Sequence, residues 1–100
     1  MRTVQSMSGC AIRLSEERWG HIQDQHPELC GMLDAILSAV GQPDLVMAGN
    51  QGELLGVKLI EPQKWLVAVY REDQVNGLVI TAFLTRRWRS LAKRRIVWQA

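Results

Sequence analysis

The sequence predicts an α+β fold in which two N-terminal helices pack on a four-stranded antiparallel sheet, a meander, and a basic segment follows at the C-terminus. Up to residue 41 the apolar side chains recur every three or four positions, which is the period of a helix. From residue 44 they alternate or form short blocks, which is typical of strands. The links between these blocks have mostly four to six residues, whereas parallel neighbours need crossovers of a dozen or more. The strands are therefore expected to be antiparallel neighbours, with both helices on one face of their sheet.

The length of 100 residues fits one domain. Hydrophobic residues make up 47% and charged residues 22%, which excludes intrinsic disorder over most of the chain. We expect residues 1–9 to form a loose leader and residues 10–100 to form the single domain. Residues 65–70 are the longest apolar run, which is too short to span a membrane. No signal peptide is visible, so a cytoplasmic location is expected.

The first expected elements are a short strand over residues 10–14 and a helix that begins after Ser15. Ser15 is a favourable N-cap, and the two acidic residues that follow it suit the positive end of the helix dipole. Pro27 disfavours the α conformation at His26, so this helix is expected to end near Gln25.

A second helix is predicted to begin at Pro27 and to end at Gly41 and Pro43. Its buried stripe has the spacing of one helix face and consists of Leu29, Leu33, Ile36, Leu37 and Val40. Strands are predicted over residues 44–48, 54–60, 65–71 and 78–85. The turns between them are predicted at residues 49–52, 61–64 and 73–77, the last of which contains the turn dipeptide Asn76–Gly77. Residues 86–100 fit either a short helix or a final edge strand.

Positive charge is concentrated near the C-terminus. The net charge is −3 over residues 1–50 and +5 over residues 51–100. Six cations occur within ten residues and without an acid among them: Arg86, Arg87, Arg89, Lys93, Arg94 and Arg95. One interpretation is a phosphate-binding edge on which Trp88 and Trp98 stack against bases. The alternatives are a solvated segment whose tryptophans fill the core, or a surface for an acidic protein partner.

Two histidines flank the end of the first helix. His21 and His26 are candidates for moving protons near neutral pH, as a general base and a general acid. On one continuous helix they would not face each other, but the break at Pro27 allows both to turn toward one side of the sheet. In the alternative interpretation each imidazole only satisfies backbone groups at the corner between the helices.

The last strand of the meander carries Thr81, Phe83 and Thr85 on one face. We expect this face to be the more open one, because the helices should cover the apolar side chains that alternate with it: Leu78, Ile80, Ala82 and Leu84. Arg71 and Arg86 end two strands, and cations beside hydroxyls at strand ends suit a phosphate. Alternatively, threonine is simply a good strand former and the arginines discourage sheet aggregation.

The two cysteines, Cys10 and Cys30, form no metal-binding spacing. We interpret them as buried thiols that act as small apolar residues rather than as a metal or redox site. No metal and no cofactor are expected.

Ordered landmarks over residues 12–98 suggest a family. They are Trp19-Gly20-His21-Ile22, His26-Pro27-Glu28, Pro43-Asp44, Thr81-Ala82-Phe83-Leu84-Thr85 and the basic tail with its tryptophans. In this order the chain resembles small bacterial and phage-associated domains of the barnase/EndoU/colicin/RelE-like nuclease superfamily. The resemblance implies two N-terminal helices against a four-stranded antiparallel sheet. It also implies metal-independent RNA cleavage, in which the 2′-hydroxyl attacks its own phosphorus.

The resemblance further implies roles for individual residues. His21 and His26 are the acid–base candidates, Thr81 or Thr85 would orient the phosphate, and Arg71 or Arg86 would stabilise transition-state charge. The expected substrate-binding residues are Arg86, Arg87, Arg89, Lys93, Arg94 and Trp98.

The leading hypothesis is thus a metal-independent endoribonuclease-like domain, a toxin or a phage-derived effector, with RNA as its partner. The alternative is a non-catalytic module of the same fold that binds nucleic acid or an acidic, antitoxin-like protein. A homodimer formed through an exposed strand or through the C-terminus is a third possibility. No membrane partner is expected.

Overall fold

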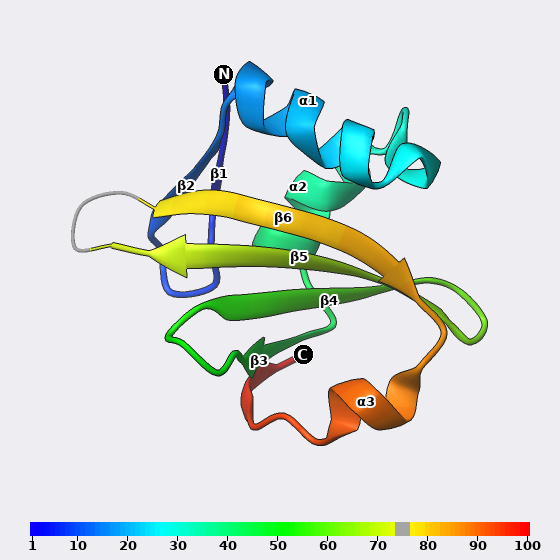
Figure 1. The fold of residues 1–100 in the computed structure, drawn as a ribbon. Helices are drawn as coiled ribbons and strands as arrows, with labels where there is room; N and C mark the ends of the chain where they lie inside the picture. The colour runs from blue at the N-terminus through cyan, green and yellow to red at the C-terminus, as the bar shows by residue number, and fades with distance from the viewer. Residues whose placement is uncertain (74–76) are drawn as a thin grey trace.

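The computed structural model describes residues 1–73 and 77–100 (Figure 1). In this part of the chain seven strands form a mixed sheet in the order β1-β2-β6-β5-β4-β3-β7. The strands are β1 (Arg2–Gln5), β2 (Ala11–Leu14), β3 (Leu45–Ala48), β4 (Leu54–Glu61), β5 (Lys64–Glu72), β6 (Gly77–Thr85) and β7 (Ile96–Gln99). The helices are α1 (Glu16–Gln25), the short 3-10 helix η1 (Pro27–Leu29), α2 (Leu33–Gly41) and α3 (Trp88–Ala92).

The predicted four-stranded antiparallel sheet is therefore wrong. The strands expected between residues 44 and 85 correspond to β3–β6, but these are only the middle of a larger sheet. β2 lies parallel to β6, with Ile12 opposite Gly77 and Arg13 opposite Leu78. The helices and three strands lie between β2 and β6 in the chain, so the long crossover that a parallel pair requires is present. Link lengths between consecutive strands carry no information about such a distant pairing.

Both ends of the chain belong to the sheet. Within residues 1–9, expected as a loose leader, β1 pairs antiparallel with β2. The Val4 side chain lies so close to Gly41 of α2 that a methyl group there would meet it at 2.6 Å. At the other end, the segment after residue 85 forms both a helix and a strand, α3 and β7. β7 is fixed to β3, and the Ala100 N–H donates to the carbonyl of Asp44 at 3.0 Å.

The predicted start and end of the first helix are confirmed, whereas the second helix is shorter than predicted. The Ser15 hydroxyl accepts the Arg18 N–H at 3.1 Å, and α1 ends at Gln25. After Pro27 the chain forms only η1, and α2 begins at Leu33. Gly31 has a φ of +80°, which no helical residue adopts, and this conformation separates η1 from α2.

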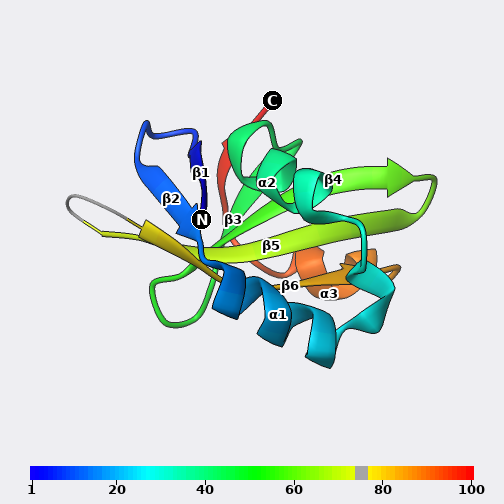
Figure 2. The same ribbon diagram turned by 90° about the horizontal axis from the view of Figure 1, so that it is seen from above.

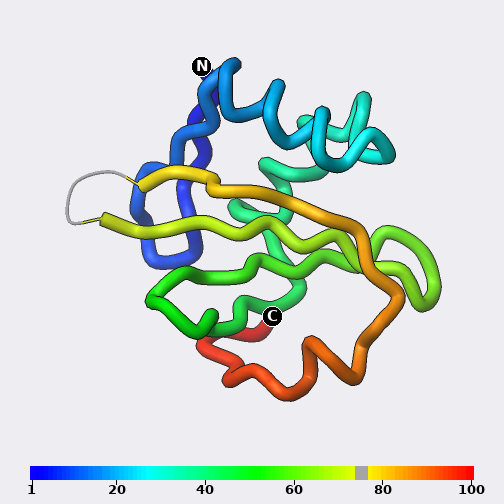
Figure 3. The backbone as a smooth tube through the Cα atoms, viewed as in Figure 1, coloured from blue at the N-terminus to red at the C-terminus, as the bar shows by residue number. Residues whose placement is uncertain are grey.

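The sheet curls around α2 and has a hydrophobic core on each face (Figures 1 and 2). On the α2 side, the core contains residues of β2, α1, α2, β5 and β6, such as Ile12, Ile22, Ile36, Leu66 and Ala82. On the other side, Leu91 of α3 packs on residues of β3, β4 and β5, namely Leu45, Met47, Leu55, Val57 and Val67. Figure 3 shows the N-terminus near the start of α1 and the C-terminus beside β3, at the opposite edge of the sheet.

An irregularity in β6 changes which of its side chains are buried. Val69 of β5 lies opposite Thr81, but the next residue, Tyr70, lies opposite Val79, so Ile80 is the extra residue of a bulge. Beyond the bulge Ala82 and Leu84 face the helices as expected. Before it, Val79 takes the buried position and Leu78 is 47% exposed, contrary to the expected alternation. The turn expected at Asn76 lies outside the described residues. Among the described helices, none has the length and apolarity needed to cross a membrane.

Candidate anion-binding surface

The cations of residues 86–95 surround α3, which is held on the sheet by Leu91. This side chain is only 5% exposed and lies in the core of the sheet face opposite α2. Its neighbours Arg86, Arg87, Arg89, Lys93 and Arg95 are exposed. An apolar anchor on a short helix therefore presents five of the twelve Lys and Arg side chains of the chain to solvent.

Two adjoining pockets make this surface continuous. The first, of about 630 Å³, is lined by Gln63, Trp65, Arg86, Arg87, Trp88, Arg89 and Ser90. The second, of about 420 Å³, is lined by Ala48, Gly49, Asn50, Ser90, Lys93, Arg94 and Arg95. Ser90 lines both pockets. We call the combined patch the α3 surface; it consists of Trp65, Arg86, Arg87, Trp88, Arg89, Ser90, Lys93, Arg94 and Arg95.

Two tryptophans form the apolar part of the α3 surface. The rings of Trp65, on β5, and Trp88, on α3, stack with their centroids 5.0 Å apart and an interplanar angle of 30°. Such a pair contributes about 0.5–1.5 kcal/mol beyond its burial and holds both rings in place. Trp88 remains 37% exposed, so part of its indole is open to a ligand in the pocket lined by three arginines.

Few carboxylates lie near these cations. In the described residues, Glu61 approaches Arg86 at 3.7 Å and Lys64 at 3.4 Å. The second acid, Glu53, lies in the loop between β3 and β4, next to the second pocket. Hydrogen bonds from the backbone N–H groups of Gln51 and of Glu53 itself, together with the charges of Arg71 and Arg94, lower the pKa of its carboxyl. The α3 surface therefore keeps a strong excess of positive charge.

Several residues predicted for the site lie on this side of the sheet. Thr85 is opposite Trp65, and its hydroxyl accepts the Arg87 N–H at 3.0 Å, which shapes the entry to α3. Thr81 is opposite Val69 and shares this face. The threonine face is half-buried rather than open, because α3 packs over part of it. Arg71 lies farther along β5, against the loop of Glu53, where its guanidinium is 3.4 Å from the position of a Cβ on Gly52.

The two histidines have separate surroundings. His21 is on the solvent side of α1, with its Nε2 3.8 Å from Glu17, in a groove that Ser15 and Arg18 also line. His26 follows the end of α1, and its Nδ1 lies 3.6 Å from Glu28. Figures 1 and 2 both show α1 ending beside the C-terminal half of β6. His26 directly follows this end of α1, whereas His21 lies more than one helical turn earlier in the helix.

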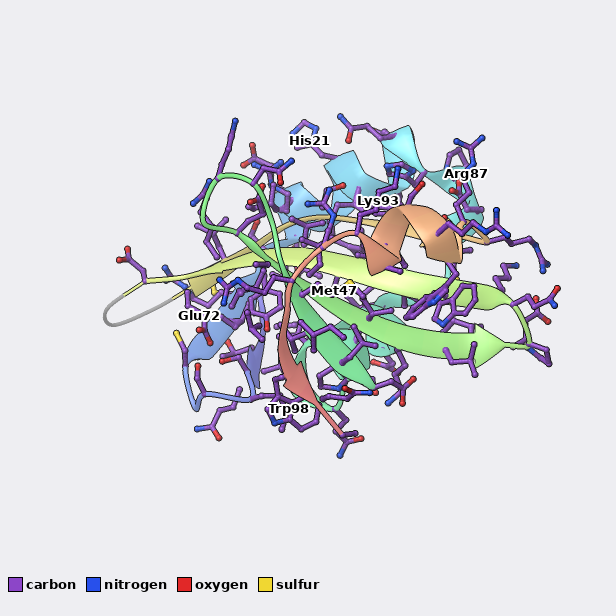
Figure 4. All side chains as sticks on the ribbon, turned by 90° about the horizontal axis from the view of Figure 1, so that it is seen from below. His21, Met47, Glu72, Arg87, Lys93 and Trp98 are labelled. Atoms are coloured by element: carbon purple, nitrogen blue, oxygen red, sulfur yellow. The ribbon has the colours of Figure 1, made fainter. Side chains whose placement is uncertain are left out.

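Trp98 does not belong to the α3 surface. In Figure 4 it lies on the opposite side of the sheet from Arg87 and Lys93. It pairs with Val46 of β3, whose side chain points away from the core beneath α3. Trp65, which was not predicted for the site, lies beside Trp88 instead, because the β5–β6 register places it opposite Thr85, directly before the basic segment.

The two cysteines differ in their exposure to solvent. Cys10 is half-buried, but Cys30 is exposed, so the expectation of two buried thiols is wrong for Cys30, which lies in the turn between η1 and α2. Among the described residues no group of three or more His, Cys, Asp and Glu side chains is arranged to hold a metal ion.

Comparison of the chain with protein-family models, with curated proteins and with solved structures gave no match.

Proposed function

We propose that this chain binds single-stranded RNA through the α3 surface. The observation that supports this most is the joining of two basic pockets at Ser90, with a stacked tryptophan pair at one end. Cations bind phosphates and release counterions, and exposed aromatic rings stack on bases that are not paired. A duplex offers no free base to Trp88, so the combination favours a single strand.

Fluorescence anisotropy with a labelled RNA decamer tests this proposal. In the variant Arg87→Gln/Lys93→Gln each pocket loses one exposed cation. We expect affinity to fall about tenfold near 0.1 M salt and the slope of log K against log salt to fall by about 1.4, since each phosphate contact to a single strand contributes about 0.7.

The matched control is Arg2→Gln/Arg13→Gln, which changes the net charge by the same amount at exposed positions of β1 and β2. It should bind RNA like the wild type. Equal losses in the two variants would mean that only net charge matters. Equal affinity for duplex and single-stranded RNA would contradict the stacking role of Trp88.

Cleavage of the bound strand is a second candidate, favoured by the course of α1, which ends directly before His26 and beside the half of β6 that leads to Thr85 and Arg86 (Figures 1 and 2). The RNA 2′-hydroxyl would lose its proton to His26 and attack phosphorus, the bond to the 5′-oxygen would break, and His26 would return the proton to that oxygen while an arginine stabilises the extra negative charge. The products would be a 2′,3′-cyclic phosphate and a free 5′-hydroxyl.

Incubation of labelled RNA with the protein in EDTA tests this step. We expect cyclic-phosphate ends from the wild type, none from His26→Ala, and a smaller change for His21→Ala. Cleavage that survives both substitutions would refute the assignment of the histidines. Intact RNA in every sample, together with tight binding, would leave a binding module as the function.

A further inference from the structure

Another cavity lies on the α2 side of the sheet, away from the α3 surface. It has a volume of about 340 Å³ and occupies the space between the β1–β2 turn and β7, the two ends that the curl of the sheet brings toward each other. Its walls include Met7, Val46, Leu54, Tyr70, Glu72 and Trp98. This volume is near the lower limit of small-molecule sites, which span about 300–1,000 Å³.

The walls combine apolar side chains with two aromatic rings. Tyr70 is 1% exposed, and Trp98 is half-buried on β7. Burial, with a smaller effect of the Glu72 carboxylate, raises the pKa of Tyr70 to about 12, so its hydroxyl is neutral at physiological pH. The negative charge at this cavity is therefore that of Glu72.

The β1–β2 turn holds the Glu72 carboxylate at the cavity. The Oε2 atom of Glu72 accepts hydrogen bonds from the hydroxyls of Ser6 and Ser8. The Ser6 hydroxyl also accepts a hydrogen bond from the Cys10 N–H at 3.2 Å. Within the described residues no lysine, arginine or histidine lies at ion-pair distance from Glu72. The turn thus orients a carboxylate against an apolar cavity without supplying a cation to neutralise it.

We propose that this cavity binds a small organic cation, an ammonium group carried on an apolar body, with Glu72 as its counter-ion and Trp98 and Tyr70 as its aromatic walls. An ammonium group near a carboxylate gains a charge-assisted hydrogen bond, and aromatic faces attract cations. The apolar body would fill the space between Met7, Val46 and Leu54. An anion of the same shape would be repelled by Glu72. This site is independent of the proposed RNA surface, because the two lie on opposite faces of the sheet.

Three probes of one shape test the proposal on the full-length chain: 2-phenylethylammonium, 2-phenylethanol and 3-phenylpropionate. The readout is the indole N–H signal of Trp98 in a ¹H–¹⁵N correlation spectrum during titration. We expect the ammonium probe to shift this signal and to bind at least about tenfold more tightly than the alcohol. The carboxylate should bind more weakly than both.

The variant Glu72→Gln keeps an oxygen that accepts the serine hydroxyls but removes the charge. It should bind the ammonium probe about as weakly as the alcohol, while Glu16→Gln, an exposed acid of α1, should leave the affinity unchanged. The proposal would be overturned if the ammonium and the alcohol bound the wild type equally. It would also be overturned if none of the three probes shifted the Trp98 signal at concentrations up to the solubility limit of the probe. The comparison of probes on the wild type needs no variant, so it decides the matter even if Glu72→Gln does not fold.

Discussion

The packing of α2 inside the curled sheet predicts a large effect of one added methyl group. Gly56 of β4 faces the backbone of α2, and a Cβ built on it would lie 2.2 Å from the carbonyl oxygen of Ala39. Both residues are buried, and the obstacle is backbone rather than the end of a flexible side chain. Gly56→Ala therefore forces α2 and β4 apart.

The size of the effect follows from that geometry. An ordinary contact begins at 3.4 Å, so α2 has to withdraw by roughly 1 Å. A shift of this size loosens the contacts of the buried residues Ile36, Ala39 and Val40 with the sheet. Overpacking of a well-packed core usually costs about 1–3 kcal/mol, and we expect Gly56→Ala to lower the free energy of unfolding by an amount near the upper end of this range.

Urea unfolding followed by tryptophan fluorescence measures this change. Gly20→Ala is the matched control, because Gly20 lies in α1 and a Cβ there meets nothing within 4 Å. It should raise the free energy of unfolding by about 0.5–1 kcal/mol, since alanine is the better helix former. If Gly56→Ala left the free energy of unfolding unchanged, or raised it as the control does, α2 would not lie against β4 as described.

Two substitutions and one titration test other parts of the structure. Leu91→Ala removes the anchor of α3 and should lower the free energy of unfolding, measured in urea, by about 2–4 kcal/mol. The affinity for RNA, measured by anisotropy, should fall with it. If neither quantity changed, Leu91 would not anchor α3. Ser15→Ala removes the N-cap of α1 and should cost about 1 kcal/mol, which the same assay would detect. Tyr70 is the one tyrosine of the sequence, so a spectrophotometric titration should give a single pKa of about 12 in the folded protein. Because this pKa lies above the unfolded value of about 10, the associated stability is present below pH 10 and is lost as pH rises toward 12; a midpoint near 10 in the folded state would show that Tyr70 is not buried.

Local sequence signals located most of the elements but not their arrangement. Ser15 and Pro27 set the limits of α1, because a cap and a proline act on their immediate neighbours. The parallel pairing of β2 with β6 and the position of α2 depend on close approaches between distant residues, such as Gly56 with Ala39. The periodicity of a short window does not carry that information, so the size and curvature of the sheet could not be predicted from the local sequence pattern.

The candidate site was predictable in charge but only partly in its aromatic residues. The run of cations without an acid indicated a basic surface whatever the fold around it. Which tryptophans join that surface depends on the side of the sheet each one occupies. Trp98 alternates onto the α2 side of β7, whereas Trp65 reaches Trp88 through the β5–β6 register. Both facts require the strand pairing, which the local pattern did not contain.

Titration of the ¹⁵N-labelled protein with a short single-stranded RNA tests the central claim most directly. The four tryptophans of the chain give separate indole N–H reporters on α1, on the α3 surface and at the cavity beside β7. The proposed function predicts large, saturable shifts for Trp65 and Trp88, with Trp98 nearly unchanged. Shifts centred on Trp98, or no shift of Trp65 and Trp88 at saturating RNA, would contradict it.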